Sequence, residues 1–313
     1  MQHGRTLRTA LVGFGLIGAA ATAAAQTVVT GVEPVDSDRP EAWATQYFTG
    51  ITSLGGFTVP ERREPGSILF GGELVWIPVM SETQRRVGFD GTRLEDLNKA
   101  PFFVRPRVTI AMPAALAATI AWVPPVEMFG VRPNLLAVAL ERPIYESAAW
   151  SIGWRAHGQT GRARAAFTCP HDVARFTPGT PANPSGCLEP SADTATLRYV
   201  AFEVSAGQSS VGRTVAPHGA VTVNYFDNQF DVDARRFDVL DGVHQEFVDR
   251  TTQKSHATRV SLRGGLAFRL ADRMQAIVDV YYMPLWVRRG ANAPRQNNGL
   301  LNARALVTYR VRQ

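Results

Sequence analysis

The chain has 313 residues, of which 45% are hydrophobic, and a mean hydropathy of −0.08. No stretch beyond the N-terminal region offers the roughly 18 consecutive apolar residues that a spanning helix requires, which excludes a helical membrane protein. The formal charge is +6, and 31 of the 33 basic residues are arginine. They form no dense basic run, so nucleic acid is not an expected partner.

The N-terminus has the features of a secretory signal peptide. Arg5 and Arg8 precede an apolar run of small residues at 9–20, and three alanines follow at 23–25. A charged start, a short apolar segment and an A-x-A site are the marks of a leader that is removed after export. We therefore predict a cleaved signal peptide over residues 1–25.

The same stretch contains a dinucleotide-binding fingerprint that we interpret as coincidental. Residues 13–18 read Gly-Phe-Gly-Leu-Ile-Gly, which matches G-x-G-x-x-G. That motif requires a preceding strand, a full helix after it and further βαβ units. Here a short alanine-rich tail follows, and the downstream sequence does not alternate strands with helices. No cofactor is predicted.

After an extended polar segment at 26–45, the chain is typical of β-structure. The pattern is alternation of apolar and polar residues, which puts one set of side chains on each face of a strand. The segments that show it before residue 230 are 68–76, 104–112, 116–123, 136–140, 150–154, 200–204 and 221–225.

The longest alternating segment covers residues 258–271. Val260, Leu262 and Leu266 belong to an apolar face, and Arg259 and Arg263 belong to the opposite face. Strands of soluble proteins average about 5–6 residues. A strand that crosses a bilayer needs about 9–11, so this length favours a membrane barrel.

The C-terminal region predicts a hairpin followed by one more strand. Asp272 and Arg273 form a tight polar turn before an alternating run at 274–286, and 288–299 is a loop rich in Gly, Pro and Asn. Alternation resumes over 301–312. Short turns on one side and long loops on the other are typical of outer-membrane barrels.

Together, the leader, the long alternating strands and the turn–loop asymmetry resemble bacterial outer-membrane β-barrel proteins. Porin-like and fatty-acid-transporter-like barrels are the nearest subtypes. The resemblance implies an all-β fold, a single antiparallel transmembrane barrel over 46–313 with about 12 strands, within a range of 10–14. It also implies outer-membrane lipid and the barrel-assembly machinery as partners. Long outer loops are expected near 168–196, 227–256 and 288–299.

Aromatic residues near predicted strand ends fit the girdles of such barrels. Trp76, Trp122, Tyr145 and Trp286 occupy such positions. The same residues could belong to the core of a β-sandwich. A soluble periplasmic β-protein is therefore the main alternative in fold and in location.

Cys169 and Cys187 are the only cysteines and flank a segment rich in Pro and Gly. In an exported protein, such a pair predicts a disulfide that closes one loop. A metal site is not predicted, because these cysteines and His171 supply too few ligands for zinc.

Arginines on the non-lipid face are the candidate functional set. A cationic lumen wall would concentrate anions and favour their passage. The alternative is a lumen filled by arginine–carboxylate pairs that use Glu141, Glu203 and Asp279. The candidate lumen residues are Arg105, Arg107, Arg259, Arg263, Arg269, Asp279, Arg304, Arg310 and Arg312.

The leading functional hypothesis is passive diffusion or uptake of a small anionic or amphipathic solute. A non-conducting barrel that acts in adhesion or structure through its outer loops is the alternative. A lipid-modifying barrel enzyme ranks third: the sequence His256-Ala257-Thr258 resembles a His-x-Ser element but has threonine at the nucleophile position. No catalytic residue is therefore assigned.

Overall fold

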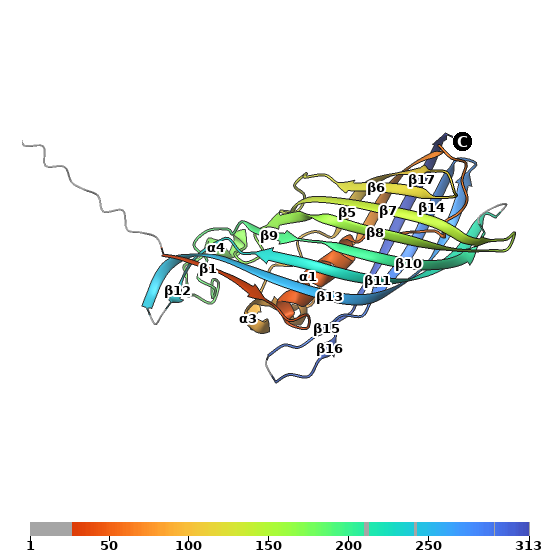
Figure 1. Cartoon of the computed structure of the whole chain (residues 1–313). Helices are drawn as coiled ribbons and strands as arrows, with labels where there is room; N and C mark the ends of the chain where they lie inside the picture. Colours follow the sequence, from red (N-terminus) through yellow and green to blue (C-terminus); the bar gives the residue numbers. More distant parts are fainter. Residues whose placement is uncertain (1–26, 210–212, 241–242, 291, 313) are drawn as a thin grey trace, which may run out of the picture.

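The computed structural model describes residues 27–209, 213–240, 243–290 and 292–312. The predicted signal peptide at 1–25 lies outside these residues. Within them, ten antiparallel strands pair in a closed ring, in which β17 returns to β2 and β11 pairs with β13 (Figure 1). The ring consists of β2 (Ile68–Trp76), β5 (Phe102–Ala111), β6 (Ala117–Val123), β7 (Arg132–Glu146), β8 (Trp150–Ala165), β10 (Tyr199–Gln208), β11 (Val215–Asp231), β13 (Val243–Ala271), β14 (Met274–Met283) and β17 (Leu300–Arg312).

The ring of ten is inside the predicted range but smaller than the expected twelve. The difference arises because much of the chain does not enter the wall. Residues 27–67 lie beside or inside the barrel, and the long connections contain short elements of their own. The latter are α2 (Glu82–Arg85), β3 (Arg86–Val87), α3 (Gly88–Gly91), β4 (Arg93–Leu94), α4 (His171–Ala174), β9 (Asp193–Thr196), β12 (Ala234–Leu240), β15 (Trp286–Val287) and β16 (Gln296–Asn297).

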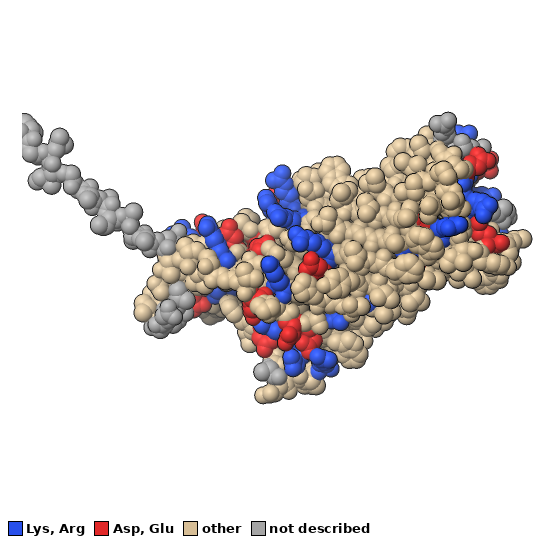
Figure 2. Space-filling view, in the orientation of Figure 1, with Lys and Arg blue, Asp and Glu red and all other residues tan. Residues whose placement is uncertain are grey.

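The predicted alternation in β13 matches the two faces of the wall. Val260, Leu262 and Leu266 are 46%, 49% and 42% exposed, whereas Ser261 and Arg263 are buried in the lumen. Figure 2 shows charged side chains gathered toward the two ends of the molecule, with a mostly uncharged surface between them. A continuous apolar belt on the outside of a closed barrel is the surface that lipid covers.

The two ends of the barrel differ as expected. At one end, here the turn end, β5 joins β6, β7 joins β8 and β13 joins β14 through short connections, and β17 ends there. The other end, the loop end, carries the long connections. Among the ring strands, Trp76 and Trp122 are exposed near the loop end, and Tyr145 and Tyr309 are exposed near the turn end. These positions fit two aromatic girdles.

The sequence indicated a long loop at 227–256, but this range is mainly strand. β11 continues to Asp231, and β12 forms a hairpin with the first half of β13. This ladder extends beyond the belt, where neither face needs to be apolar. Mixed charged and apolar residues on both faces therefore hid the strands from a search for alternation.

An N-terminal segment passes through the lumen. β1 (Thr27–Pro34) pairs in parallel with β13 at the loop end, and α1 (Pro40–Thr52) then lies inside the barrel (Figure 1). Residues 53–67 continue to the turn end, where β2 begins beside Arg312. The expected division into an extended 26–45 and a barrel from 46 is therefore wrong: the wall begins at Ile68.

The composition of α1 explains both its place and why it was missed. Pro40 stands at the first helical position, and Glu41 lies in the first turn, where a carboxylate favours a helix start. Eleven of its 13 residues are buried. Trp43, Tyr47 and Ile51 belong to one apolar cluster with residues of β14 and the following loop. A helix enclosed on all sides has no solvent-exposed face: Thr45 and Thr49 contact Ser255 and Asn228 of the wall, so α1 lacks the charged outer face that marks an amphipathic surface helix. Among the described residues, no helix is long and apolar enough to span a bilayer.

We expect Val223→Arg to destabilise the barrel in a membrane by about 2–4 kcal/mol, the cost of a cation near the bilayer midplane. Val223 is 49% exposed on the outer face of β11. The matched change Val243→Arg, at an exposed site on the hairpin beyond the belt, should cost about 1 kcal/mol or less. Urea unfolding in lipid vesicles measures both, and equal costs would contradict the assigned belt.

Candidate functional site

A chain of ion pairs runs along the inner face of the wall. Arg263 donates to Glu203 and to Asp279, each at 2.8 Å. Arg155 binds Glu141 at 2.6 Å and also donates to Glu203. All five side chains are buried. The chain of alternating charges therefore links β7, β8, β10, β13 and β14 along one side of the inner wall.

The remaining lumen arginines bind the N-terminal segment. Arg304 donates to the carbonyl oxygens of Gly50 at 2.8 Å and Ser53 at 2.9 Å. Arg105 donates to the carbonyl oxygens of Thr52 at 2.7 Å and Ser53 at 3.0 Å, and it is also paired with a glutamate of β2. Cations at the C-terminal end of a helix satisfy its free carbonyl groups and its dipole. These arginines therefore hold α1 to the wall.

The structure brings together part of the predicted arginine set. Arg105, Arg107, Arg263 and Arg304 lie buried in the lumen, as does Asp279. Their side chains bind carboxylates and backbone carbonyl groups and do not line an open passage. This matches the alternative considered above, a lumen filled by paired charges.

The other predicted arginines lie toward the ends. Arg259 is half-buried near the start of α1 and donates to Gln46 and to the carbonyl oxygen of Ser37. Arg269 and Arg310 line a cavity of about 530 Å³ at the turn end. The backbone of Arg312 pairs with Ile68, and its side chain lies outside the described residues.

Sequence reasoning did not assign Arg155, Glu73 or His218. Arg155 is 1% exposed, Glu73 pairs with Arg105, and His218 contacts Asp279 at 2.7 Å. Arg155 could have been found, because Trp150, Ile152 and Trp154 were placed on the lipid face and their neighbours must face inward. Glu73 follows two glycines that conceal the alternation of β2.

A cavity of about 620 Å³ lies at the loop end, above the segment that fills the lumen. Glu41, Thr45 and Phe48 of α1 contribute to its lining. The wall residues come from β1, the connection after β2, and the extended parts of β11, β12 and β13. The volume is in the range of pockets for small molecules. Its lining combines aromatic and charged side chains.

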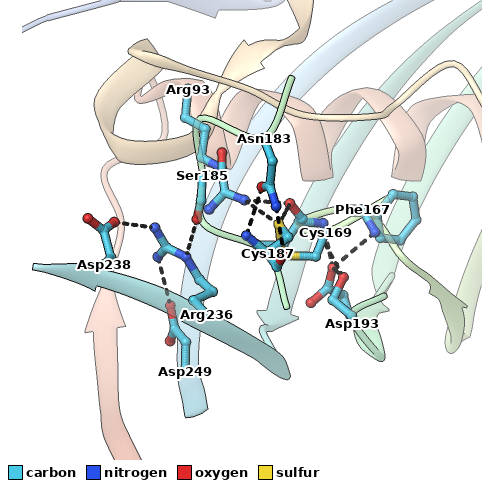
Figure 3. The surroundings of a disulfide bond; sticks show 12 residues. Arg93, Phe167, Cys169, Asn183, Ser185, Cys187, Asp193, Arg236, Asp238 and Asp249 are labelled. Atoms are coloured by element: carbon cyan, nitrogen blue, oxygen red, sulfur yellow. Dashed lines mark hydrogen bonds and ion pairs between the residues drawn. A yellow bond between two sulfur atoms is a disulfide. The ribbon is translucent and has the colours of Figure 1, made fainter. Parts of the chain in front are cut away.

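The predicted bridge between Cys169 and Cys187 is present beside this cavity (Figure 3). Arg93 donates to the carbonyl oxygen of Thr168, and Arg236 donates to that of Ser185. Both arginines also line the cavity. The bridged loop therefore supports the side chains that form one wall of the cavity.

Asp193 fixes the base of the bridged loop. Its carboxylate accepts hydrogen bonds from the backbone of Phe167 at 3.0 Å and Thr168 at 2.7 Å, and from the Ser191 hydroxyl at 2.7 Å (Figure 3). Burial raises the pKa of Asp193, although these donors oppose the shift. The loop is thus tied to β9 by side-chain bonds as well as by the bridge.

The histidine considered for catalysis lies on the outside of the wall. His256 contacts Asp227 at 3.1 Å and stacks on Tyr225. Among the described residues, no serine or threonine hydroxyl is hydrogen-bonded to its ring. Likewise, no group of three or more His, Cys, Asp or Glu side chains that could hold a metal is found in the described part of the chain.

Comparison with known proteins finds structural similarity without sequence relationship. No family model and no curated protein matches the chain. The outer membrane protease OmpT of Escherichia coli is similar over 78% of this chain and 94% of its own, with a TM-score of 0.38 and 7% identity. The toluene transporter TbuX of Ralstonia pickettii is similar over 79% and 90%, with a TM-score of 0.33 and 7% identity.

A third similar structure is Ail, the attachment invasion locus protein of Yersinia pestis, with coverage of 79% and 99%, a TM-score of 0.26 and 10% identity. These proteins are outer-membrane barrels with different activities, and the chain resembles them as a barrel. No activity follows from the likeness.

Replacing Glu203 by glutamine should destabilise the protein by about 3 kcal/mol, because Arg155 and Arg263 would share too little negative charge in a buried site. Arg155 keeps Glu141 and Arg263 keeps Asp279, which limits the loss of stability. Glu246→Gln removes the partner of Arg235 in an exposed pair and should cost less than about 1 kcal/mol. Urea unfolding of both variants measures the difference.

Replacing both cysteines by serine should loosen the bridged loop without opening the barrel. The bridge closes a loop with a sequence separation of 18, which is worth about 3 kcal/mol of chain entropy. We expect faster proteolysis within 170–186 and unchanged heat-modifiable migration on detergent gels. A barrel that no longer migrates as a folded species would contradict a role confined to the loop.

Proposed function

We propose that the protein is an outer-membrane barrel that captures a small amphipathic solute at its loop end and takes it up through the lumen after the N-terminal segment moves aside. The observation that carries this proposal is the cavity of about 620 Å³ whose lining includes α1 itself. Aromatic and charged side chains share that lining. Its position above a filled lumen supports capture followed by release rather than free diffusion.

Because α1 and residues 53–67 fill the lumen, uptake would require this segment to move. α1 and residues 53–67 lie between the cavity at the loop end and the one at the turn end. The segment is held by hydrogen bonds from arginines to its backbone carbonyls and by the apolar packing of α1, and its residues 40–67 contribute no strand to the ring. Moving the segment would break these side-chain contacts but no pairing of the ring strands, which is continuous. The segment is therefore the part that would have to move.

A covalent link between α1 and the wall tests this directly. The Thr45 Oγ1 atom lies 3.4 Å from the Ser255 Oγ atom, so T45C/S255C should form a bridge on oxidation. The control pair T109C/T119C replaces two hydroxyls 2.8 Å apart that both belong to the wall. Uptake of 2-phenylethylammonium and of 3-phenylpropanoate into proteoliposomes is measured, because their charges slow passage through lipid.

We expect the oxidised T45C/S255C protein to take up either probe at less than about a tenth of the native rate, and the oxidised control pair to match native. Reductant should restore uptake by the linked variant. Because reductant also opens the Cys169–Cys187 bridge, native protein measured under the same reductant serves as the reference. Native-like uptake by the linked protein would refute movement of α1. Native protein that takes up neither probe would refute uptake.

The second candidate is a non-conducting barrel that acts through its loop-end structures. The filled lumen and the extended β12–β13 hairpin favour it. It predicts no uptake and no conductance in either the linked or the native protein.

A further inference from the structure

The cavity at the loop end has a continuous aromatic wall. The ring centroids of Phe48 and Phe167 are 6.4 Å apart, and those of Phe167 and Phe230 are 6.1 Å apart. Among the described residues, no arginine or lysine lies over these three rings, whereas Phe89 and Phe247 are already covered by the Arg236 guanidinium. The faces of aromatic rings attract cations. The free rings therefore offer a surface for a ligand that carries its own positive charge.

Two buried carboxylates in the same lining have an oxygen without a partner. Glu41 is 8% exposed and Glu95 is 9% exposed, and in each the Oε2 atom has no hydrogen-bond donor. The other oxygen of Glu41 accepts from Arg39 and from the backbone of Asp90. The other oxygen of Glu95 lies 3.4 Å from the Arg93 Nε atom. Buried acceptors left unpaired are costly unless a ligand supplies the donor.

The cavity lining also carries more negative than positive side chains. The described lining contains three arginines, which are Arg39, Arg93 and Arg236, against five carboxylates. Arg236 is paired with Asp238 and Asp249, and Arg39 is paired with Glu33 and Glu41. The formal excess of two negative charges, which is one while Glu95 is protonated, favours a cationic occupant and disfavours an anionic one.

From these observations we propose that the cavity binds a small organic cation, an ammonium group on an aromatic or apolar body. The ammonium donates to the free oxygens of Glu41 and Glu95, and the body packs against Phe48, Phe167 and Phe230. This assignment rests on the proposed function, because it names the class of solute that the same cavity captures. It also replaces the expectation of an anionic solute.

The protonation of Glu95 links this binding to pH. The pKa of Glu95 is raised to about 8, mainly by burial; Arg93 and Arg236 lower it in part, and Asp193 and Glu41 add to the increase. At neutral pH the empty site therefore holds the neutral acid. A cation favours the ionised form, so its binding should release a proton below about pH 8. Affinity then rises as pH increases toward 8 and becomes constant above it.

Three probes with a phenyl body separate the ligand classes: 2-phenylethylammonium, 2-phenylethanol and 3-phenylpropanoate. Binding to the full chain in a non-ionic detergent is measured by calorimetry at several pH values up to about 9, where an alkylammonium keeps its proton. We expect the ammonium to bind about tenfold more tightly than the alcohol, and the carboxylate to bind most weakly. Tightest binding of the carboxylate, or equal binding of all three, would overturn the cation assignment but leave capture by the cavity intact.

Variants identify the residues. Glu95→Gln should weaken the ammonium about tenfold, the loss of one charge-assisted hydrogen bond, and should remove the pH dependence. Binding of the alcohol should change less than about twofold. Glu246→Gln, at an exposed side chain that is absent from the cavity lining, should change the binding of neither probe. Heat-modifiable migration confirms that each variant is folded.

Phe167→Leu serves as a second, uncharged test, because it removes a ring face but keeps an apolar side chain. It should weaken the ammonium several-fold more than the alcohol. Unchanged ammonium binding in both variants would place the cation elsewhere and overturn the proposal. If none of the three probes binds the folded native protein, capture by this cavity fails together with the cation assignment.

Discussion

The carbonyl end of α1 sets the constraint on which the rest of the structure depends. A helix that ends inside a barrel leaves several carbonyl groups without intrahelical partners, in a place where little water can reach them. Arg304 and Arg105 supply the missing donors from opposite sides of the β17–β2 seam. Arg107 does the same for Gly55 just beyond the helix. The lumen arginines are thus explained first by the segment they hold.

The charges that remain in the lumen form a balanced network, in which three arginines pair with three carboxylates: Arg63, Arg155 and Arg263 with Glu141, Glu203 and Asp279. Arg155 and Arg263 each bind two carboxylates, and Glu203 is shared between them. Arginine suits this role, because its planar group reaches several acceptors and stays charged. A wall built this way stabilises a filled barrel and has no excess of free cations along the lumen. Selection of a solute by charge would then occur above the network, at the loop end.

The sequence predicted the wall well and the lumen poorly, for a physical reason. Lipid imposes alternation on residues such as Val260 and Leu262, and alternation can be read from one strand at a time. The partner of an inward side chain depends on the register of strands far apart in the chain, as for Arg263 with Glu203. Enclosure on all sides also left α1 without the charged solvent face by which a helix is usually recognised. The extended β12–β13 hairpin was not predicted because it lies beyond the lipid-facing belt, where alternation of apolar and polar residues is not required.

The cavity and the lumen segment share residues, which couples ligand binding to the position of α1. Glu41, Thr45 and Phe48 belong to the helix and also line the cavity. A solute can shift the helix only by the difference between its affinities for the two positions. A ligand that used the wall residues alone would leave α1 where it is. A cation on the free oxygen of Glu41 weakens the attraction between that carboxylate and Arg39, which binds the other oxygen and is the N-cap residue of α1. The charge of the ligand therefore decides whether its binding can loosen the N-terminal end of α1. Arg304 and Arg105 still hold the C-terminal end of the helix.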